Sequence, residues 1–271
     1  MAILDKVQKA DEIDPTKPNP LKILLIGASG TGKTTGATTL PGRKLLIDLD
    51  GRSDCVAGFK DLSILRIIEA NPSQPIAWFD LEKLKDEIWS QVRQNKFPYD
   101  SLIVDGITAL CKFAMNWALM LSGADGKMMS KSPGGGPSRP HYSPAMFALD
   151  RWINSILALP INILFTTHEE LFEDEHLQTL TFYPKITGKL RTELANWFNE
   201  SYLTTTTKGV NKIKYLWYTI SGGDRRPFVK NSLNPLGKYW NDPIELDFDK
   251  KPNGFELLLE KRYGKEKEVK K

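Results

Sequence analysis

The chain has 271 residues, a net charge of +4, and ordinary fractions of apolar and charged residues, 41% and 26%. This length suits one large α/β domain with appendages, and so small a net charge does not by itself indicate a nucleic-acid partner. Cys55 and Cys111 form no CxxC pair, so we expect no thiol metal site and a reduced, cytoplasmic protein. The first residues lack a signal-peptide core and no apolar run suits a membrane span, so we expect no membrane partner.

The first half of the chain alternates apolar strands with helices after a polar lead-in over residues 1–20. Apolar runs predict strands at 22–26, 43–50, 63–68 and 101–105. Apolar residues at helical spacing predict a helix over about 80–94 and another over 107–121. Residues 122–142 are rich in glycine and proline, and we expect a flexible loop there.

In the second half, a helix is predicted to begin at Ser143, its N-cap, and to end at Pro160. A strand at 161–167, a polar segment at 168–187 and a short helix at 190–198 follow. The chain then becomes β-rich, with strands at 200–205, 212–220 and 227–230, before a disordered charged tail from 265. This alternation predicts an α/β fold with a mostly parallel sheet, helices on both faces and a β-rich C-terminal part.

A phosphate-binding P-loop follows the first strand, because residues 27–34 match G-x-x-x-x-G-K-[ST] between a strand and a helix. Its glycines let backbone N–H groups close around phosphate oxygens, and the helix N-terminus adds partial positive charge. Lys33 is expected to reach the β- and γ-phosphates, and Thr34 to place its hydroxyl on Mg²⁺. The predicted nucleotide-binding residues are Gly27, Ala28, Ser29, Gly30, Thr31, Gly32, Lys33, Thr34 and Thr35.

Polar residues at the ends of three other strands join Lys33 as expected catalytic residues, since ligands bind at the carboxyl ends of parallel strands. Asp105 closes an apolar strand in a Walker B pattern and should support the Mg²⁺ shell beside Thr34. Asp50, which we place on the strand beside the P-loop strand, could polarise water, although Asp50-Gly51 is also a good turn. His168 could sense the γ-phosphate or could be structural.

The loop at 122–142 carries basic and aromatic residues suited to single-stranded DNA, through phosphate contacts and base stacking. A solvated surface loop explains such residues equally well. The candidates there are Lys127, Lys131, Arg139 and Tyr142. A late hairpin carries further cations, one of which could reach a neighbouring subunit's γ-phosphate as a finger: Arg225, Arg226 and Lys230.

Residues 20–232 resemble the RecA-like recombinase ATPases, in particular the small RecA/RadB-like phage proteins grouped with the Sak single-strand annealing proteins. The resemblance is carried by the P-loop and by residues 46–50, 102–110 and 165–168. It implies a RecA-like P-loop NTPase core at 21–232, between the lead-in at 1–20 and a C-terminal extension at 233–271. Asp50 stands where RecA commonly has Glu. The resemblance places DNA-binding loops at 122–142 and 169–187, but the acids at 169–175 are unlike such a loop, so Lys185, Lys189 and Arg191 just after them are the better DNA-binding candidates.

The resemblance also implies an ATP-binding, Mg²⁺-dependent ATPase that couples nucleotide state to single-stranded DNA binding in phage-type recombination, annealing or replication. Expected partners are single-stranded DNA, further copies in a ring or filament, and a single-strand-binding protein, in the host cytoplasm if the chain is phage-encoded. A P-loop kinase and a nucleotide-dependent scaffold protein remain alternatives. An AAA+ remodeller carries a helical lid after its core, whereas residues 200–230 are predicted as strands.

Overall fold

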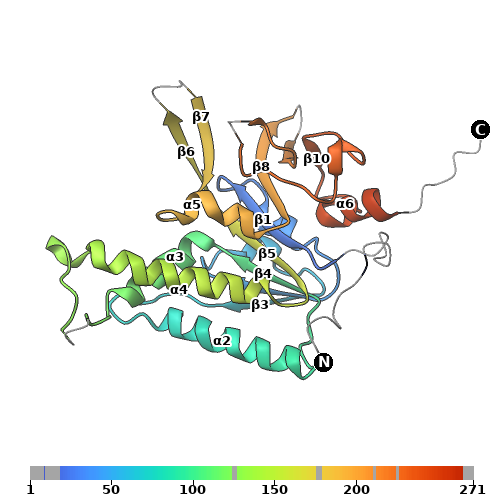
Figure 1. Cartoon of the computed structure of the whole chain (residues 1–271). Helices are drawn as coiled ribbons and strands as arrows, with labels where there is room; N and C mark the ends of the chain where they lie inside the picture. Colours follow the sequence, from blue (N-terminus) through green and yellow to red (C-terminus); the bar gives the residue numbers. More distant parts are fainter. Residues whose placement is uncertain are drawn as a thin grey trace, which may run out of the picture.

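The computed structural model describes residues 9, 19–123, 127–174, 179–209, 212–223 and 226–264. Its centre is an eight-stranded sheet in the order β10-β9-β8-β1-β5-β4-β2-β3 (Figure 1). The six strands from β8 to β3 run parallel, and β9 and β10 are antiparallel. The strands are β1 (Lys22–Gly27), β2 (Lys44–Asp48), β3 (Leu62–Arg66), β4 (Ser101–Asp105), β5 (Asn162–Thr167), β8 (Glu200–Lys208), β9 (Ile213–Tyr218) and β10 (Ile244–Leu246).

Helices cover both faces of this sheet, because successive strand residues point to opposite sides. Leu24 and Ile26 of β1 belong to the core beneath α2, α3 and α4, which Figure 1 shows stacked together. Ile23 and Leu25 belong to the opposite core, with residues of α1 and α6. The helices are α1 (Lys33–Ala37), α2 (Ile76–Arg93), α3 (Ile107–Ala118), α4 (Arg139–Leu157), α5 (Leu190–Glu193) and α6 (Gly254–Tyr263). The predicted α/β class, with a mostly parallel sheet and helices on both faces, is therefore confirmed.

The order of the strands differs from one expectation. We placed the strand that leads to Asp50 beside the P-loop strand, whereas β5 and β4 lie between β1 and β2. Parallel neighbours are joined by long crossovers, so adjacency in the sheet does not follow adjacency in the chain. The carboxyl ends of all these strands nevertheless share one edge of the sheet.

The polar segment 168–187, for which we predicted no strand, contains a two-stranded antiparallel hairpin of β6 (Glu169–Asp174) and β7 (Thr179–Pro184). This hairpin projects from the edge of the main sheet (Figure 1). By contrast, residues 227–230 form no strand, and Lys230 makes only an isolated bridge to Ser201. Both differences arise because pairing with a partner segment, rather than local composition, decides whether a short segment is a strand.

Helix α4 begins at Arg139, four residues before the predicted N-cap at Ser143. Ser138 and His141 form a capping box, in which the Ser138 backbone N–H donates to His141 Nδ1 at 3.1 Å. Arg139 and Tyr142 therefore lie on a helix rather than in the predicted loop. Pro144 is inside the helix, where it removes one backbone donor.

Residues beyond 232 pack onto the same body. Strand β10 pairs with β9, and Phe255 of α6 is buried against the Tyr202 and Trp217 rings, with centroids 6.0 and 4.8 Å away. Within the described part of the chain, no helix combines the length and apolar character needed to cross a bilayer. The predicted lead-in, apart from residues 9, 19 and 20, and the tail from 265 lie outside the described residues.

Candidate functional site

The P-loop connects β1 to α1 in the strand–loop–helix arrangement that the sequence predicts. Gly32 caps α1 with a φ of 78°, and a Cβ there would lie 2.9 Å from both the Tyr215 and Phe248 rings. Only glycine fits that position without strain. Lys33 Nζ donates to the carbonyl oxygens of Gly27 at 2.8 Å and Ala28 at 2.6 Å, so the side chain folds back over the loop.

A cavity of about 300 Å³ lies over the P-loop at the carboxyl ends of the central strands. It brings together the four predicted catalytic residues, which come from three separate strand ends and the loop. Its lining is Ser29, Gly30, Gly32, Lys33, Thr34, Thr35, Asp50, Arg52, Cys55, Asp105, Gly106, Thr166, Thr167, His168 and Tyr215. Sequence reasoning missed Arg52, Cys55 and Tyr215, because nothing in their local pattern distinguishes them from ordinary surface residues.

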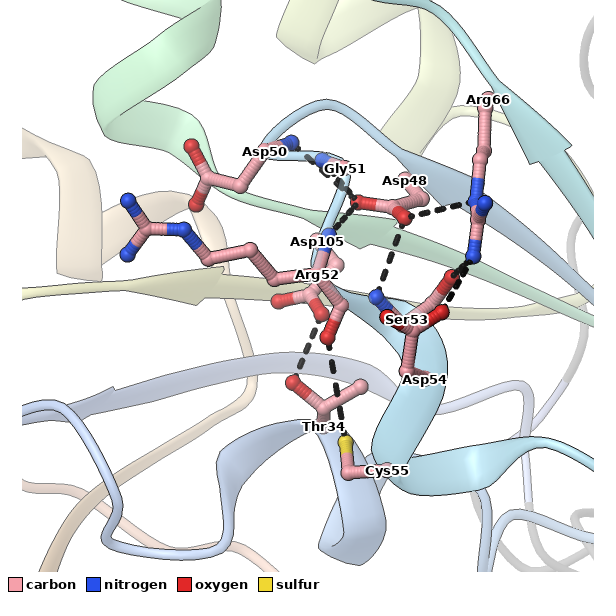
Figure 2. A network of polar contacts seen from close by, with 10 residues as sticks. All are labelled: Thr34, Asp48, Asp50, Gly51, Arg52, Ser53, Asp54, Cys55, Arg66 and Asp105. Atoms are coloured by element: carbon pink, nitrogen blue, oxygen red, sulfur yellow. Dashed lines mark hydrogen bonds and ion pairs between the residues drawn. The ribbon is translucent and has the colours of Figure 1, made fainter.

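Asp105, at the end of β4, joins the P-loop to the neighbouring strand β5. Thr34 Oγ1 donates to Asp105 Oδ2 at 2.7 Å, and Thr166 Oγ1 donates to Asp105 Oδ1 (Figure 2 draws the first contact). Burial raises the pKa of the Asp105 carboxyl, while the Thr166 and Thr34 hydroxyls lower it. The two hydroxyls therefore fix both carboxylate oxygens at the bottom of the cavity.

The Thr34–Asp105 pair suits a magnesium ion. Hydroxyl and carboxylate oxygens are hard ligands, and Mg²⁺ is typically held by one or two carboxylates plus substrate phosphates rather than by an all-protein cage. Among the described residues, no group of three or more His, Cys, Asp or Glu side chains is placed to hold a metal ion. Thr34 and Asp105 are the residues that would hold the ion.

Asp48 is buried at the end of β2 and organises the turn that carries Asp50. Its Oδ1 accepts backbone N–H groups of Asp50 at 3.2 Å, Gly51 at 2.7 Å and Arg52 at 3.3 Å, and its Oδ2 accepts that of Ser53 at 3.1 Å (Figure 2). This network gives Asp48 a structural role. Asp50 itself is exposed and lines the cavity.

The Asp50 carboxylate lies over the start of α3. A Cβ built on Gly106, whose φ is 112°, would lie 2.9 Å from Asp50 Oδ2. Asp50 therefore reaches the Asp105 end of the cavity even though β2 is not beside β1. The turn and the catalytic interpretation of Asp50 are compatible, because Asp48 holds the turn and leaves the Asp50 side chain directed into the cavity.

The Lys33 charge acts on two neighbouring titratable groups, His168 and Glu169. Burial lowers the pKa of Lys33, and Asp105, Glu169 and Asp50 oppose that shift. Burial and the Lys33 charge lower the pKa of His168, so its imidazole is neutral near pH 7. Glu169, which follows His168, has a pKa raised by burial and lowered by Lys33, and its Oε2 is buried without a hydrogen-bond partner among the described residues.

Sequence reasoning did not connect Glu169 with Lys33. It counted Glu169 among the acids at 169–175 that are unlike a DNA-binding loop, and the structure adds that its carboxylate lies in the electrostatic environment of Lys33. The available signal was its position, one residue past the polar end of a central strand. The carboxylate contributes negative charge to the P-loop side of the hairpin base.

Three of the seven DNA-binding candidates come together in a second cavity of about 410 Å³. This cavity, here called the basic groove, is bounded by Lys112, Tyr142, Lys185 and Arg191, with Glu170 beside them. Arg191 is engaged within the chain, 3.4 Å from Glu170 Oε2 and 4.1 Å from the centre of the Phe172 ring. Lys112 was missed because it lies on the exposed side of a helix whose apolar stripe dominated the sequence pattern.

The other candidates lie outside the lining of the basic groove. They are Lys127, Lys131, Arg139 and Lys189, all exposed, and Lys189 pairs with Glu193 at 2.9 Å. Among the finger candidates, Arg226 stacks 4.1 Å from the Tyr218 ring centre, and Lys230 Nζ donates to the Asn196 carbonyl at 3.3 Å. Arg225 lies outside the described residues. The finger and DNA-binding roles stay predictions.

Replacing Asp48 with Asn should lower the free energy of unfolding by about 1–3 kcal/mol, because an amide NH₂ would oppose backbone N–H groups that now have an acceptor. Urea unfolding of the purified protein measures this change. The matched control is Asp54→Asn, since Asp54 lies in the same turn but its side chain is 89% exposed. Equal effects of the two substitutions would contradict the role assigned to Asp48.

His168 should make the protein less stable as the pH falls from 7 to 5. Its pKa is lowered from 6.5 in the folded chain, so as the pH falls the unfolded chain binds a proton at His168 before the folded chain does. Proton binding therefore stabilises the unfolded state relative to the folded state until the pH has fallen below the folded-state pKa. The variant His168→Gln lacks this contribution, so the difference in unfolding free energy between wild type and variant should decrease with falling pH. A difference that does not change with pH would refute the burial of a neutral imidazole.

The P-loop and the mostly parallel sheet confirm the predicted α/β fold of a P-loop NTPase with a β-rich C-terminal part. Among solved structures, the chain is similar to the flagellar accessory protein FlaH from Methanocaldococcus jannaschii, at 12% identity and a TM-score of 0.40, covering 84% of this chain and 85% of that one. It is also similar to a KaiC-like protein from Pyrococcus horikoshii, at 14% identity and a TM-score of 0.38, covering 74% and 78%.

The search of curated proteins found no match to the sequence. A family model described as an AAA domain matches residues 19–219, about three quarters of the chain. The matched range contains the P-loop, Asp50, Asp105 and His168, and within it residues 200–208 and 213–218 are strands rather than a helical lid. The chain therefore belongs to the AAA domain family and is a P-loop ATPase.

Proposed function

We propose that this ATPase couples its nucleotide state to the binding of single-stranded DNA, in phage-type recombination, annealing or replication. The observation that carries the proposal is the basic groove, which is lined at the base of the β6–β7 hairpin by Glu170 and Lys185, close in sequence to His168 of the nucleotide cavity. Lys112 and Lys185 are exposed there and suit phosphate contacts. The Tyr142 ring is 41% exposed and suits stacking on a base.

The β6–β7 hairpin supplies a physical link between the two cavities. His168 lines the nucleotide cavity, and Glu170, two residues along, lines the basic groove. The Lys185 backbone N–H donates to the His168 carbonyl at 2.7 Å, and Thr108 of α3 donates to the Lys185 carbonyl at 3.2 Å. A displacement of His168 toward a γ-phosphate would therefore move the base of the hairpin and the groove together.

For hydrolysis, the cavity residues take separate roles. Lys33 leaves the loop carbonyls and contacts the β- and γ-phosphates, Asp50 orients the attacking water, and neutral His168 accepts or donates a hydrogen bond at the γ-phosphate. Bound Mg²⁺, held at Thr34 and Asp105, would neutralise charge on the phosphates. The preference for ATP is part of this proposal.

We also propose self-association into a ring or filament, in the cytoplasm of the cell that makes the protein, and a single-strand-binding protein as a further partner. A neighbouring subunit would then bring Arg225, Arg226 or Lys230 toward the γ-phosphate. For Arg226 and Lys230 this role requires release from their present contacts with Tyr218 and the Asn196 carbonyl.

Steady-state ATP hydrolysis with and without single-stranded DNA tests the proposal, with Lys33→Ala as the blank. We expect turnover that DNA stimulates and that disappears in the variant, because the hairpin base connects the groove to the γ-phosphate. Hydrolysis that depends on Lys33 but is indifferent to DNA would contradict the coupling and favour the scaffold alternative. Transfer of phosphate to a small acceptor in place of water would favour the kinase alternative.

The double variant Lys112→Ala/Lys185→Ala should bind single-stranded DNA about 10-fold or more weakly, with a salt dependence reduced by about one unit of slope for each lost phosphate contact. DNA-independent ATP hydrolysis should stay near the wild-type rate, since neither lysine lines the nucleotide cavity. Fluorescence anisotropy across a salt series measures the affinity. Lys83→Ala, an exposed lysine on α2, is the control, and an equal loss in that variant would contradict the groove as the binding site.

A further inference from the structure

Arg52 is a cation in the nucleotide cavity that none of the predicted roles uses. Its side chain is exposed and lines the cavity together with Lys33, Asp50 and Asp105. Within the described part of the chain, no hydrogen bond or ion pair of the guanidinium is present. The nearby Arg66 differs, because it pairs with Asp48 at 3.5 Å and with Asp54 at 2.8 Å.

The backbone of Arg52 is held in place although its side chain is free to act. Asp48 Oδ1 accepts a hydrogen bond from the Arg52 backbone N–H at 3.3 Å. The two Asp48 carboxylate oxygens also accept hydrogen bonds from the backbone N–H groups of the flanking residues, Gly51 and Ser53. Figure 2 shows the Arg52 side chain directed away from Arg66, on the same side of the turn as the Asp50 carboxylate. A buried carboxylate thus positions an arginine and an aspartate toward one cavity.

We propose that Arg52 binds the γ-phosphate of ATP in cis and stabilises the negative charge that develops there during hydrolysis. This inference rests on ATP hydrolysis at the cavity, as proposed above. A guanidinium presents several N–H donors in a planar fork that matches phosphate oxygens, so an arginine without an anionic partner beside a P-loop suits this ligand.

The placement of Arg52 favours the γ-phosphate over the rest of the nucleotide. It shares a turn with Asp50, whose carboxylate reaches Gly106 at the Asp105 end of the cavity. Thr34 and Asp105 mark that end as the one that receives the terminal phosphates. The finger candidates Arg226 and Lys230 are engaged elsewhere in the chain, so Arg52 is the cation in the described cavity lining, besides Lys33, that can supply charge without a partner subunit.

The test compares Arg52→Ala and Arg52→Lys with wild type, using the full chain with Mg²⁺. We expect Arg52→Ala to lower the rate constant of ATP hydrolysis about 100-fold or more, as for loss of one preorganised donor to a developing charge. The affinity for a non-hydrolysable ATP analogue should fall while the affinity for ADP stays within about twofold. Arg52→Lys should recover part of the rate, because it restores charge without the planar fork.

Arg93→Ala is the control, because Arg93 is an exposed arginine on α2 outside the cavity lining, and it should leave all three values unchanged. An Arg52→Ala variant that hydrolyses ATP at the wild-type rate, or loses ADP affinity as much as ATP-analogue affinity, would overturn the γ-phosphate contact. A wild-type protein without Lys33-dependent hydrolysis would instead contradict the proposed function. In that event a selective loss of ATP-analogue over ADP binding in Arg52→Ala would still support the contact.

Discussion

The parallel register at the carboxyl ends of β2, β4 and β5 is the constraint on which the site depends. Asp48 is paired with Asp105, and Asp105 with Thr166, so three polar side chains lie in one row. The residues just before them, Ile47, Val104 and Phe165, are also paired in one row and are buried in the same core. A shift of one residue would turn those apolar side chains out of the core, so the core enforces the position of the polar row.

Three aspartates at this edge perform different tasks because their surroundings differ. Asp48 is buried, and its carboxylate accepts hydrogen bonds from backbone N–H groups, which fixes a turn. Asp105 has a pKa raised by burial and receives two hydroxyls, which suits a metal ion. Asp50 is exposed and free to meet water or phosphate. Asp48 and Asp105 are thus fixed by their hydrogen bonds, while the Asp50 side chain stays open to the cavity, and the β6–β7 hairpin begins directly after His168.

Much of this arrangement is predictable from sequence, because the P-loop, the apolar strands and their polar ends are local patterns. The position of β2 is not, since its neighbours are set by crossovers many residues long. The hairpin at 169–184 was missed because its acids and exposed apolar side chains show no single buried face. The start of α4 was predicted too late in the chain, because Ser143-Pro144 has the pattern of an N-cap. The actual capping box begins at Ser138 and uses His141 in place of Glu or Gln. The sites to which Lys112, Glu169 and Arg52 belong are formed by neighbours distant in sequence, so local patterns do not indicate them.

Coupling between the nucleotide cavity and the basic groove is the central claim, and equilibrium DNA affinity in different nucleotide states tests it most directly. Single-stranded DNA binding should be measured without nucleotide, with ADP and with a non-hydrolysable ATP analogue, each with Mg²⁺. Coupling predicts affinity that is about 5- to 150-fold tighter with the ATP analogue than with ADP, and a reciprocal gain in analogue affinity when DNA is present. The Lys33→Ala variant should lose this difference. Equal DNA affinity in all three states would contradict the coupling.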